Sequence, residues 1–149
     1  MLRYAIPLGL VGMFVAFSLG AADPPQTTRY QIDVPGGTVR DAMTQLTWQR
    51  DSKTAGIKNR SEAHDFCAGL KLGGKRWRLP TVMELWSLVD LGHPEPTIDP
   101  AAFPDTPAEN FWTSSRYLDS PTLAWSIGFE GGAKHGHRAD LALRVRCVR

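Results

Sequence analysis

The chain has 149 residues, a length that suits one domain. Its formal net charge of +2 does not indicate a nucleic-acid partner or a strongly acidic one. Five Trp, six Phe and three Tyr are enough for a compact aromatic core, while 14 Gly and 11 Pro predict long loops.

The first 22 residues have the parts of an export signal. Arg3 supplies a positive start, residues 5–19 are mostly apolar, and Gly20-Ala21-Ala22 supplies small residues for cleavage. The alternative is a retained membrane anchor, but a span needs about 20 apolar residues and this run is shorter and contains Pro7. We expect residues 1–22 to be removed, leaving a protein exported to the periplasm, the cell surface or the medium, without membrane contact.

A flexible, polar lead at 23–28 is expected to precede the domain at 29–149, which opens with short strands. Tyr30, Ile32 and Val34 alternate with polar residues, as in a strand. After the turn at 35–37, strands are expected at 38–41 and 46–49, the second with Leu46 and Trp48 on one face.

A first helix is expected after a polar loop at 51–58. Asn59 or Ser61 can cap it, and Glu62 follows Asn59 by three positions. The residues with the i, i+3, i+4, i+7 spacing of an apolar helix face are Ala63, Phe66, Cys67 and Leu70. Gly73-Gly74 then ends the helical pattern.

A second helix has a well-defined start at Thr81, directly after Pro80. Thr81 can cap the first turn, and Glu84 can accept a hydrogen bond from the Thr81 backbone, which makes a capping box. The predicted apolar face consists of Val82, Leu85, Trp86 and Val89. We expect the rest of the domain to cover this face.

The second half of the chain is expected to form a long loop and then strands. Residues 91–110 contain five prolines, which exclude a helix or a central strand. Strand patterns follow at 111–115 and 125–129. On the last strand Leu141, Leu143, Val145 and Cys147 alternate with Arg144 and Arg146 on the opposite face. Short strands, two helices and a long loop indicate an α+β fold.

Cys67 and Cys147 are the two cysteines of the chain. In an exported protein a disulfide is the default state of such a pair, and a reactive thiol is the alternative. Both sulfurs lie on apolar faces of predicted elements, so packing the helix on the sheet would bring them into one core. The bond would close a loop worth roughly 4 kcal/mol in the chain-entropy description.

Several short motifs, in this order, resemble one family. They are residues 37–41, 46–50, 63–67, Gly73-Gly74 with 77–81, then 84–90, 111–115, Ala124-Trp125 and 145–149. Together they resemble the Lcl C-terminal domain family over residues 29–149. The resemblance implies a C-type-lectin-like α+β fold with a small mixed, mainly antiparallel sheet, two helices, a long loop region and one disulfide.

The resemblance also implies a non-enzymatic role. The family occurs mostly in exported bacterial proteins, and some of these are adhesins that bind sulfated polysaccharide. The similar formylglycine-generating enzymes share Arg-Leu-Pro-Thr but rely on two active-site cysteines that bind copper, chemistry that a Cys67–Cys147 disulfide would remove. Gln45 stands where the family usually has glycine, so a left-handed turn there would be strained.

Two groups of residues are candidate metal ligands. Asp90, Glu95 and Asp99, with His93 nearby, surround the start of the long loop, where carboxylates can bind calcium. A solvated acidic loop is the simpler interpretation, so we expect no cofactor. His135 and His137 would point to one side of an extended segment, but two ligands make a weak site for a transition metal.

Basic residues near the end of the chain are candidate ligand-binding groups. We expect Lys134, His135, His137, Arg138 and Arg116 to gather near the loops between the late strands. Basic groups there, together with Arg144 and Arg146, suit sulfate or carboxylate recognition. Ordinary surface charge is the alternative.

The sequence thus predicts an exported, non-enzymatic binding or adhesion module. Its partner would be an extracellular polysaccharide or a surface protein, held by the loops at 91–110 and 133–138. No nucleophile elbow, P-loop or His-Glu-x-x-His motif occurs. The alternatives are a formylglycine-generating-enzyme-like oxidoreductase that has lost its catalytic cysteines and a structural envelope component.

Overall fold

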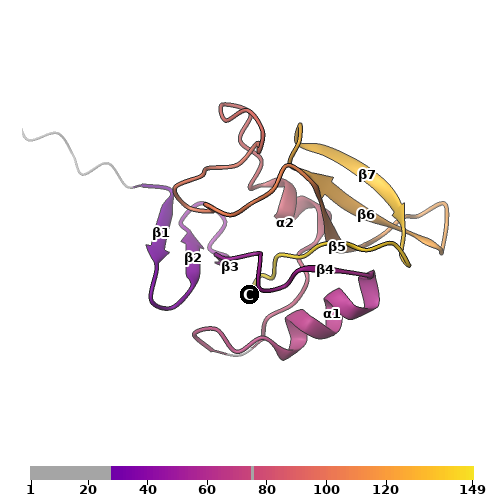
Figure 1. The fold of residues 1–149 in the computed structure, drawn as a ribbon, viewed down its shortest axis with the longest axis horizontal. Coiled ribbons are helices and arrows are strands. Elements are labelled where there is room, and N and C mark those ends of the chain that lie inside the picture. Colours follow the sequence, from indigo (N-terminus) through magenta and orange to yellow (C-terminus); the bar gives the residue numbers. More distant parts are fainter. Residues whose placement is uncertain (1–27, 75) are drawn as a thin grey trace, which may run out of the picture.

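The structure is a computed structural model and describes residues 28–149 except residue 75. The predicted export signal and nearly all of the lead lie outside these described residues. Figure 1 shows the elements, which in chain order are β1 (Tyr30–Asp33), β2 (Thr38–Asp41), β3 (Thr47–Gln49), β4 (Ile57–Lys58), α1 (Arg60–Gly69), α2 (Val82–Trp86), β5 (Asn110–Arg116), β6 (Leu123–Gly128), β7 (Ala133–Arg138) and β8 (Leu143–Arg144).

The strands form two sheets rather than the single sheet expected. β1, β2 and β3 make a three-stranded antiparallel sheet. The second sheet has the order β4-β8-β5-β6-β7 and is antiparallel except for the β5–β8 pair. Val148, near the C-terminus, bridges Trp48 of β3 and Arg78 before α2. The predicted α+β class with two helices and a mainly antiparallel arrangement is confirmed, while the similarity to C-type lectins stays a prediction.

The helices cover opposite faces of the larger sheet. Phe111 belongs to an apolar cluster with Leu85 of α2, and Trp112 belongs to a second cluster with Cys67 of α1. Successive residues of a strand point to opposite faces, so the two clusters lie on the two sides of β5. In Figure 1, α2 and α1 lie above and below this sheet.

α1 begins as predicted. The Asn59 side chain accepts a hydrogen bond from the Glu62 amide, and the Glu62 carboxylate accepts one from the Asn59 amide, both at 3.0 Å. This capping box identifies Asn59, rather than Ser61, as the cap. The helix ends at Gly69, earlier than predicted, because Leu70 takes an extended conformation as its C-cap.

α2 also begins with its predicted capping box, formed by Thr81 and Glu84, but regular helix ends at Trp86. The chain continues with tighter turns, in which backbone amides bond to the third residue before them. This change of period turns Leu88 into the core, where it is fully buried, whereas Trp86, the last residue of the regular helix, is 42% exposed. The prediction that Trp86 belongs to the buried face is therefore wrong.

Three strand predictions differ from the structure. β1 is an outer strand, and both its Ile32 and Val34, which directly follows it, are exposed. The Tyr30 ring packs edge-on against the Phe103 ring, with ring centres 5.4 Å apart. Residues 133–138, expected as a loop, form the edge strand β7. The last strand is reduced to β8, and the segment after it is extended and bonds to β3.

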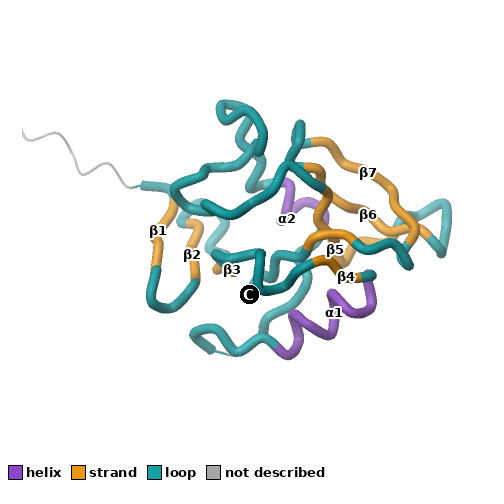
Figure 2. Tube along the Cα trace, in the orientation of Figure 1, coloured by secondary structure: helices purple, strands orange, loops and turns teal. Residues whose placement is uncertain are grey.

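The predicted long loop between α2 and β5 is an ordered part of the core. Ile98 and Phe103 are buried, and Phe129 accepts hydrogen bonds from both the amide (2.8 Å) and the hydroxyl (3.1 Å) of Thr97. Figure 2 shows this segment running over the top of the molecule without helix or strand. Its prolines exclude regular structure, and its buried side chains hold the segment in place instead.

The predicted disulfide is confirmed. The sulfurs of Cys67 and Cys147 are 2.00 Å apart, and the bond joins buried positions of α1 and the C-terminal segment. Both thiols of the chain are thus bonded, and the reactive-thiol alternative is wrong.

Gln45 does adopt the left-handed conformation, with φ of 63°. Its side-chain amide donates to the Ala42 carbonyl at 2.6 Å, and its side-chain oxygen accepts a bond from Arg40 at 2.5 Å. These local bonds help to offset the strain of a side chain at a position where glycine would be unstrained.

The cap of α2 is expected to make stability depend on pH. Arg78 donates two 2.8 Å hydrogen bonds to the Glu84 carboxylate and, with the Thr81 amide, lowers the pKa of Glu84 to about 2. The pKa is lower in the folded state than in the unfolded state. The stabilisation is therefore present above the unfolded pKa of roughly 4.3 and is lost as pH falls toward 2.

Replacing Glu84 with glutamine is expected to lower the free energy of unfolding by about 1 kcal/mol at pH 7. The difference from the unmodified protein should shrink below pH 3, where that protein loses the same contribution. Urea unfolding at pH 7 and pH 2.5 measures both values, and an equal loss at the two pH values would contradict this role of the carboxylate.

Candidate ligand-binding groove

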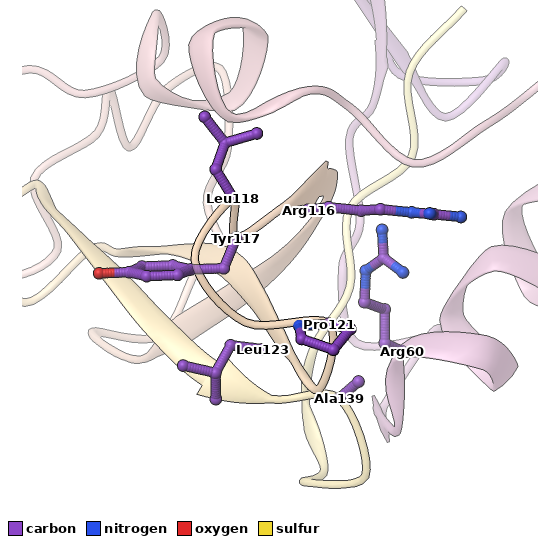
Figure 3. Close-up of a pocket in the computed structure, with 7 residues that line it drawn as sticks. All are labelled: Arg60, Arg116, Tyr117, Leu118, Pro121, Leu123 and Ala139. Carbon is purple, nitrogen blue, oxygen red and sulfur yellow. The ribbon is translucent and has the colours of Figure 1, made fainter.

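Two adjoining cavities lie where α1 begins and β5 ends. Their volumes are about 490 and 460 Å³, and both are lined by Arg60, Arg116 and Ala139. Arg60 is the first residue of α1 and Arg116 is the last of β5. In Figure 3 the Arg60 side chain extends toward the Arg116 side chain, which runs across the end of it. We call this pair of cavities the two-arginine groove.

The fold fixes Arg60 through backbone contacts. Its amide donates to the Ala139 carbonyl at 3.0 Å, and its guanidinium donates to the carbonyls of Thr113 (Nε, 3.2 Å) and Ser114 (Nη2). These carbonyls lie where the β5–β6 register shifts, between Trp112 and Arg116. An irregularity of this kind leaves strand carbonyls without ladder partners, and here Arg60 binds them.

The groove carries positive charge that no carboxylate of the described residues neutralises. The arginines that form ion pairs are Arg29, Arg78, Arg138, Arg144 and Arg146. Arg60 and Arg116 are not among them, and none of the lining residues of either cavity is acidic. Burial, and then the charge of Arg116, lower the pKa of Arg60. An anion placed between the two guanidinium groups would relieve this repulsion.

The two cavities differ in character. The first has an apolar wall formed by Tyr117, Leu118, Pro121 and Leu123, and Leu118 is 95% exposed at its rim. The second is lined by Ser61, His64, Leu79 and Ser114, in addition to the residues that both cavities share. A ligand can thus place an anionic group at the centre and extend from it in either direction.

Tyr117 depends on a glycine of the edge strand for its position. Its ring lies on Trp125, with ring centres 4.5 Å apart, and also on Gly136 of β7. A Cβ at Gly136 would come within 2.8 Å of the Tyr117 ring. A side chain at this position would force the Tyr117 ring to move, so glycine allows the ring to lie where it does.

β7 holds its two histidines on one side, as predicted for an extended segment. The ring centres of His135 and His137 are 5.9 Å apart. His137 Nδ1 is 2.9 Å from the Ser126 hydroxyl, and burial followed by the nearby His135 lowers the pKa of His137. His135 Nε2 lies 3.4 Å from a Glu130 carboxylate oxygen. Both rings therefore interact with neighbours from β6 and the turn after it.

The structure does not bring the predicted basic residues together. Lys134 lies at the far end of β7, with its ammonium 4.5 Å above the Trp86 ring of α2. Arg138 lies at the near end, where it forms an ion pair with Asp140. Of the five predicted ligand-binding residues, Arg116 lines the groove. The ligand-binding role of the other four stays a prediction.

Neither arginine of the last strand is a free surface group. Arg144 forms two hydrogen bonds with Glu109, at 2.9 and 3.0 Å. Arg146 is completely buried, because the long loop covers the face that alternation assigned to the surface. It is therefore not available to an external anion.

The predicted calcium ligands serve the loop backbone. Asp90 accepts a bond from the Gly92 amide at 2.9 Å and lies 3.0 Å from His93; these two contacts lower the pKa of Asp90. Asp99 accepts a bond from the Ala101 amide at 2.8 Å, and Glu95 is exposed. Within residues 28–149, residue 75 apart, no three His, Cys, Asp or Glu side chains form a group that could hold a metal ion.

Arg60 is the groove residue that sequence reasoning missed. It directly follows the helix cap, and nothing in its neighbourhood marks it as a ligand group. It reaches Arg116 because the start of α1 bonds to Ala139, after β7, and to the irregular part of β5. Both contacts are distant in sequence and have no local signal.

Comparison with known families identifies one family that matches most of the chain. The part of the chain that the structure describes has no helix long and apolar enough to cross a membrane. No curated protein matches the chain. A family model described as the Lcl C-terminal domain matches residues 37–149, a range that includes both helices, both cysteines and both arginines of the groove. The chain therefore belongs to the Lcl C-terminal domain family.

Proposed function

We propose that this domain is an exported, non-enzymatic binding or adhesion module that holds an anionic extracellular polysaccharide in the two-arginine groove. The observation that carries the proposal is the pair of guanidinium groups that line the same groove without a carboxylate partner among the described residues. Guanidinium groups bind sulfate and carboxylate oxygens through paired, charge-assisted hydrogen bonds.

The disulfide supports the non-enzymatic and exported parts of the proposal. It joins Cys67 to Cys147, so no free thiol would be available to bind copper as in the formylglycine-generating enzymes. Disulfides also persist in oxidising compartments outside the cytosol. A polysaccharide suits the groove because its repeating anionic groups can supply the central charge while its sugar rings extend into both cavities.

The test compares three polymers that share one backbone: neutral dextran, carboxymethyl dextran and dextran sulfate. The purified protein should bind the two anionic polymers and not neutral dextran. Replacing Arg116 with alanine should weaken binding by about 10-fold or more, the value of one charge-assisted contact. Titration calorimetry at low salt measures these affinities, and exposed salt-dependent contacts should weaken as salt is added.

Lys53→Ala is the control for this substitution. Lys53 is exposed and lies outside the groove, and its replacement removes the same formal charge. If the two substitutions weakened binding equally, the effect of Arg116→Ala would be explained by net charge alone. Absence of binding to both anionic polymers would reject the proposal and favour a structural envelope component. Binding to an extracellular protein that is insensitive to Arg116 would favour a protein ligand elsewhere on the surface.

A further inference from the structure

We propose that His64 is the third cationic group of the two-arginine groove, so that anion binding strengthens as pH falls from about 8 to about 5.5. This inference rests on the proposed function and adds a condition under which the groove works best. Histidine is the side chain whose charge ordinarily changes in this pH range.

The position of His64 follows from the helix. It stands four residues after Arg60 on α1, one turn further along the same face. It lines the second cavity together with Arg60 and Arg116. Its side chain is 68% exposed.

Three charged groups lie beside His64 or line the same cavity. Asp65, also exposed, lies 3.2 Å from His64 Nδ1. Arg60 and Arg116 line the second cavity together with His64. The remaining lining residues are Ser61 of α1, Leu79 before α2, Ser114 of β5 and Ala139 after β7, and none of them titrates.

A bound anion compensates the charges of Arg60 and Arg116. A protonated His64 ring adds a further attraction to the anion. Binding of the anion and of the proton therefore strengthen each other, as linkage requires of any two coupled ligands.

The expected size of the effect is that of one partly exposed charge interaction. Such interactions correspond to about a three- to tenfold change in affinity. Dextran sulfate is the appropriate probe, since its sulfate esters keep their charge over the whole range. The affinity of the unmodified protein should be about three- to tenfold higher at pH 5.5 than at pH 8, at constant ionic strength.

Two variants test whether His64 causes the increase in affinity at low pH. His64→Gln should bind with nearly the same affinity at pH 5.5 as it does itself at pH 8, so that the increase is lost. His135→Gln removes a histidine of β7 outside the groove and should keep the full increase. A melting curve at each pH verifies that both variants are folded.

The outcomes separate this inference from the proposed function. If the protein binds dextran sulfate with one affinity at both pH values, or if His64→Gln keeps the increase, the role of His64 is rejected and the proposed function stands. If His135→Gln removes the increase, the titrating group lies on β7, which also rejects it. If no binding occurs at either pH, both proposals fail.

Discussion

Replacing Arg146 with alanine is expected to lower the free energy of unfolding by about 3–5 kcal/mol, the loss typical of breaking up a buried charge network. Arg146 is completely buried and donates to the carbonyls of Gln49 (3.0 Å) and Arg50 (2.9 Å) and to the Thr106 hydroxyl (2.7 Å). Its guanidinium also lies 4.6 Å from the Phe103 ring centre. One side chain thus joins the small sheet, the long loop and the C-terminal segment.

Arg146 stays charged at neutral pH. Burial lowers its pKa to about 10, while the carboxylates of Asp105 and Asp51 act in the opposite direction. Asp105 lies 3.9 Å away, and its pKa is itself lowered: burial opposes this, but Asp51, the Lys53 amide and Arg146 together prevail. Removal of the guanidinium would therefore leave several buried acceptors without donors.

Arg144→Ala is the matched control, because Arg144 is a neighbour in sequence whose ion pair with Glu109 is partly exposed. Its replacement should change stability by at most about 1 kcal/mol. Urea unfolding of the two variants measures the difference. A loss below about 1 kcal/mol for Arg146→Ala would show that Arg146 does not hold the long loop to the sheets.

Removing the disulfide is expected to cost about 4 kcal/mol. Cys67 and Cys147 are separated by 80 residues, and in the chain-entropy description a cross-link over so long a loop strongly restricts the unfolded state. The double variant Cys67→Ala/Cys147→Ala should unfold at a much lower urea concentration than the unmodified protein.

A reductant provides the second arm of this experiment. Because the chain has no other cysteine, a reductant should destabilise the unmodified protein toward the level of the double variant and leave the variant unchanged. If the double variant were as stable as the unmodified protein, the link between α1 and the C-terminal segment would have no structural importance.

Features with local causes could be predicted from the sequence. The capping boxes at Asn59 and Thr81 depend on residues three positions apart, and both are present in the structure. Cys67 and Cys147 could be paired because both lie on apolar faces and the chain offers no other partner. The prolines of the long loop likewise exclude regular structure within it, however the rest of the chain folds.

Features with distant causes could not be predicted. Trp86 completes the expected apolar pattern, yet its indole donates to the carbonyl of Gly132 after β6 and stays partly exposed. β7 contains lysine, histidine and glycine rather than strand-forming residues, and it becomes a strand because β6 offers it an edge. Arg146 alternates like a surface residue, and only the covering loop makes it a core residue.

The groove combines a feature with a local cause and features with distant causes. Arg116 is a basic residue at the end of a predictable strand, and sequence reasoning selected it as a ligand-binding candidate. Arg60 and His64 belong to a helix that was also predictable, but their approach to Arg116 depends on how α1 meets the irregular end of β5. A sequence pattern does not contain that information.

The most direct test of the two-arginine groove is a titration of the isotope-labelled protein with short dextran sulfate chains, followed through the arginine Nε–Hε signals. The signals of Arg60 and Arg116 should shift with the added ligand, while those of Arg40 and Arg144, outside the groove, should stay in place. Shifts confined to β7 or to the long loop, with Arg60 and Arg116 unchanged, would contradict this assignment of the binding site.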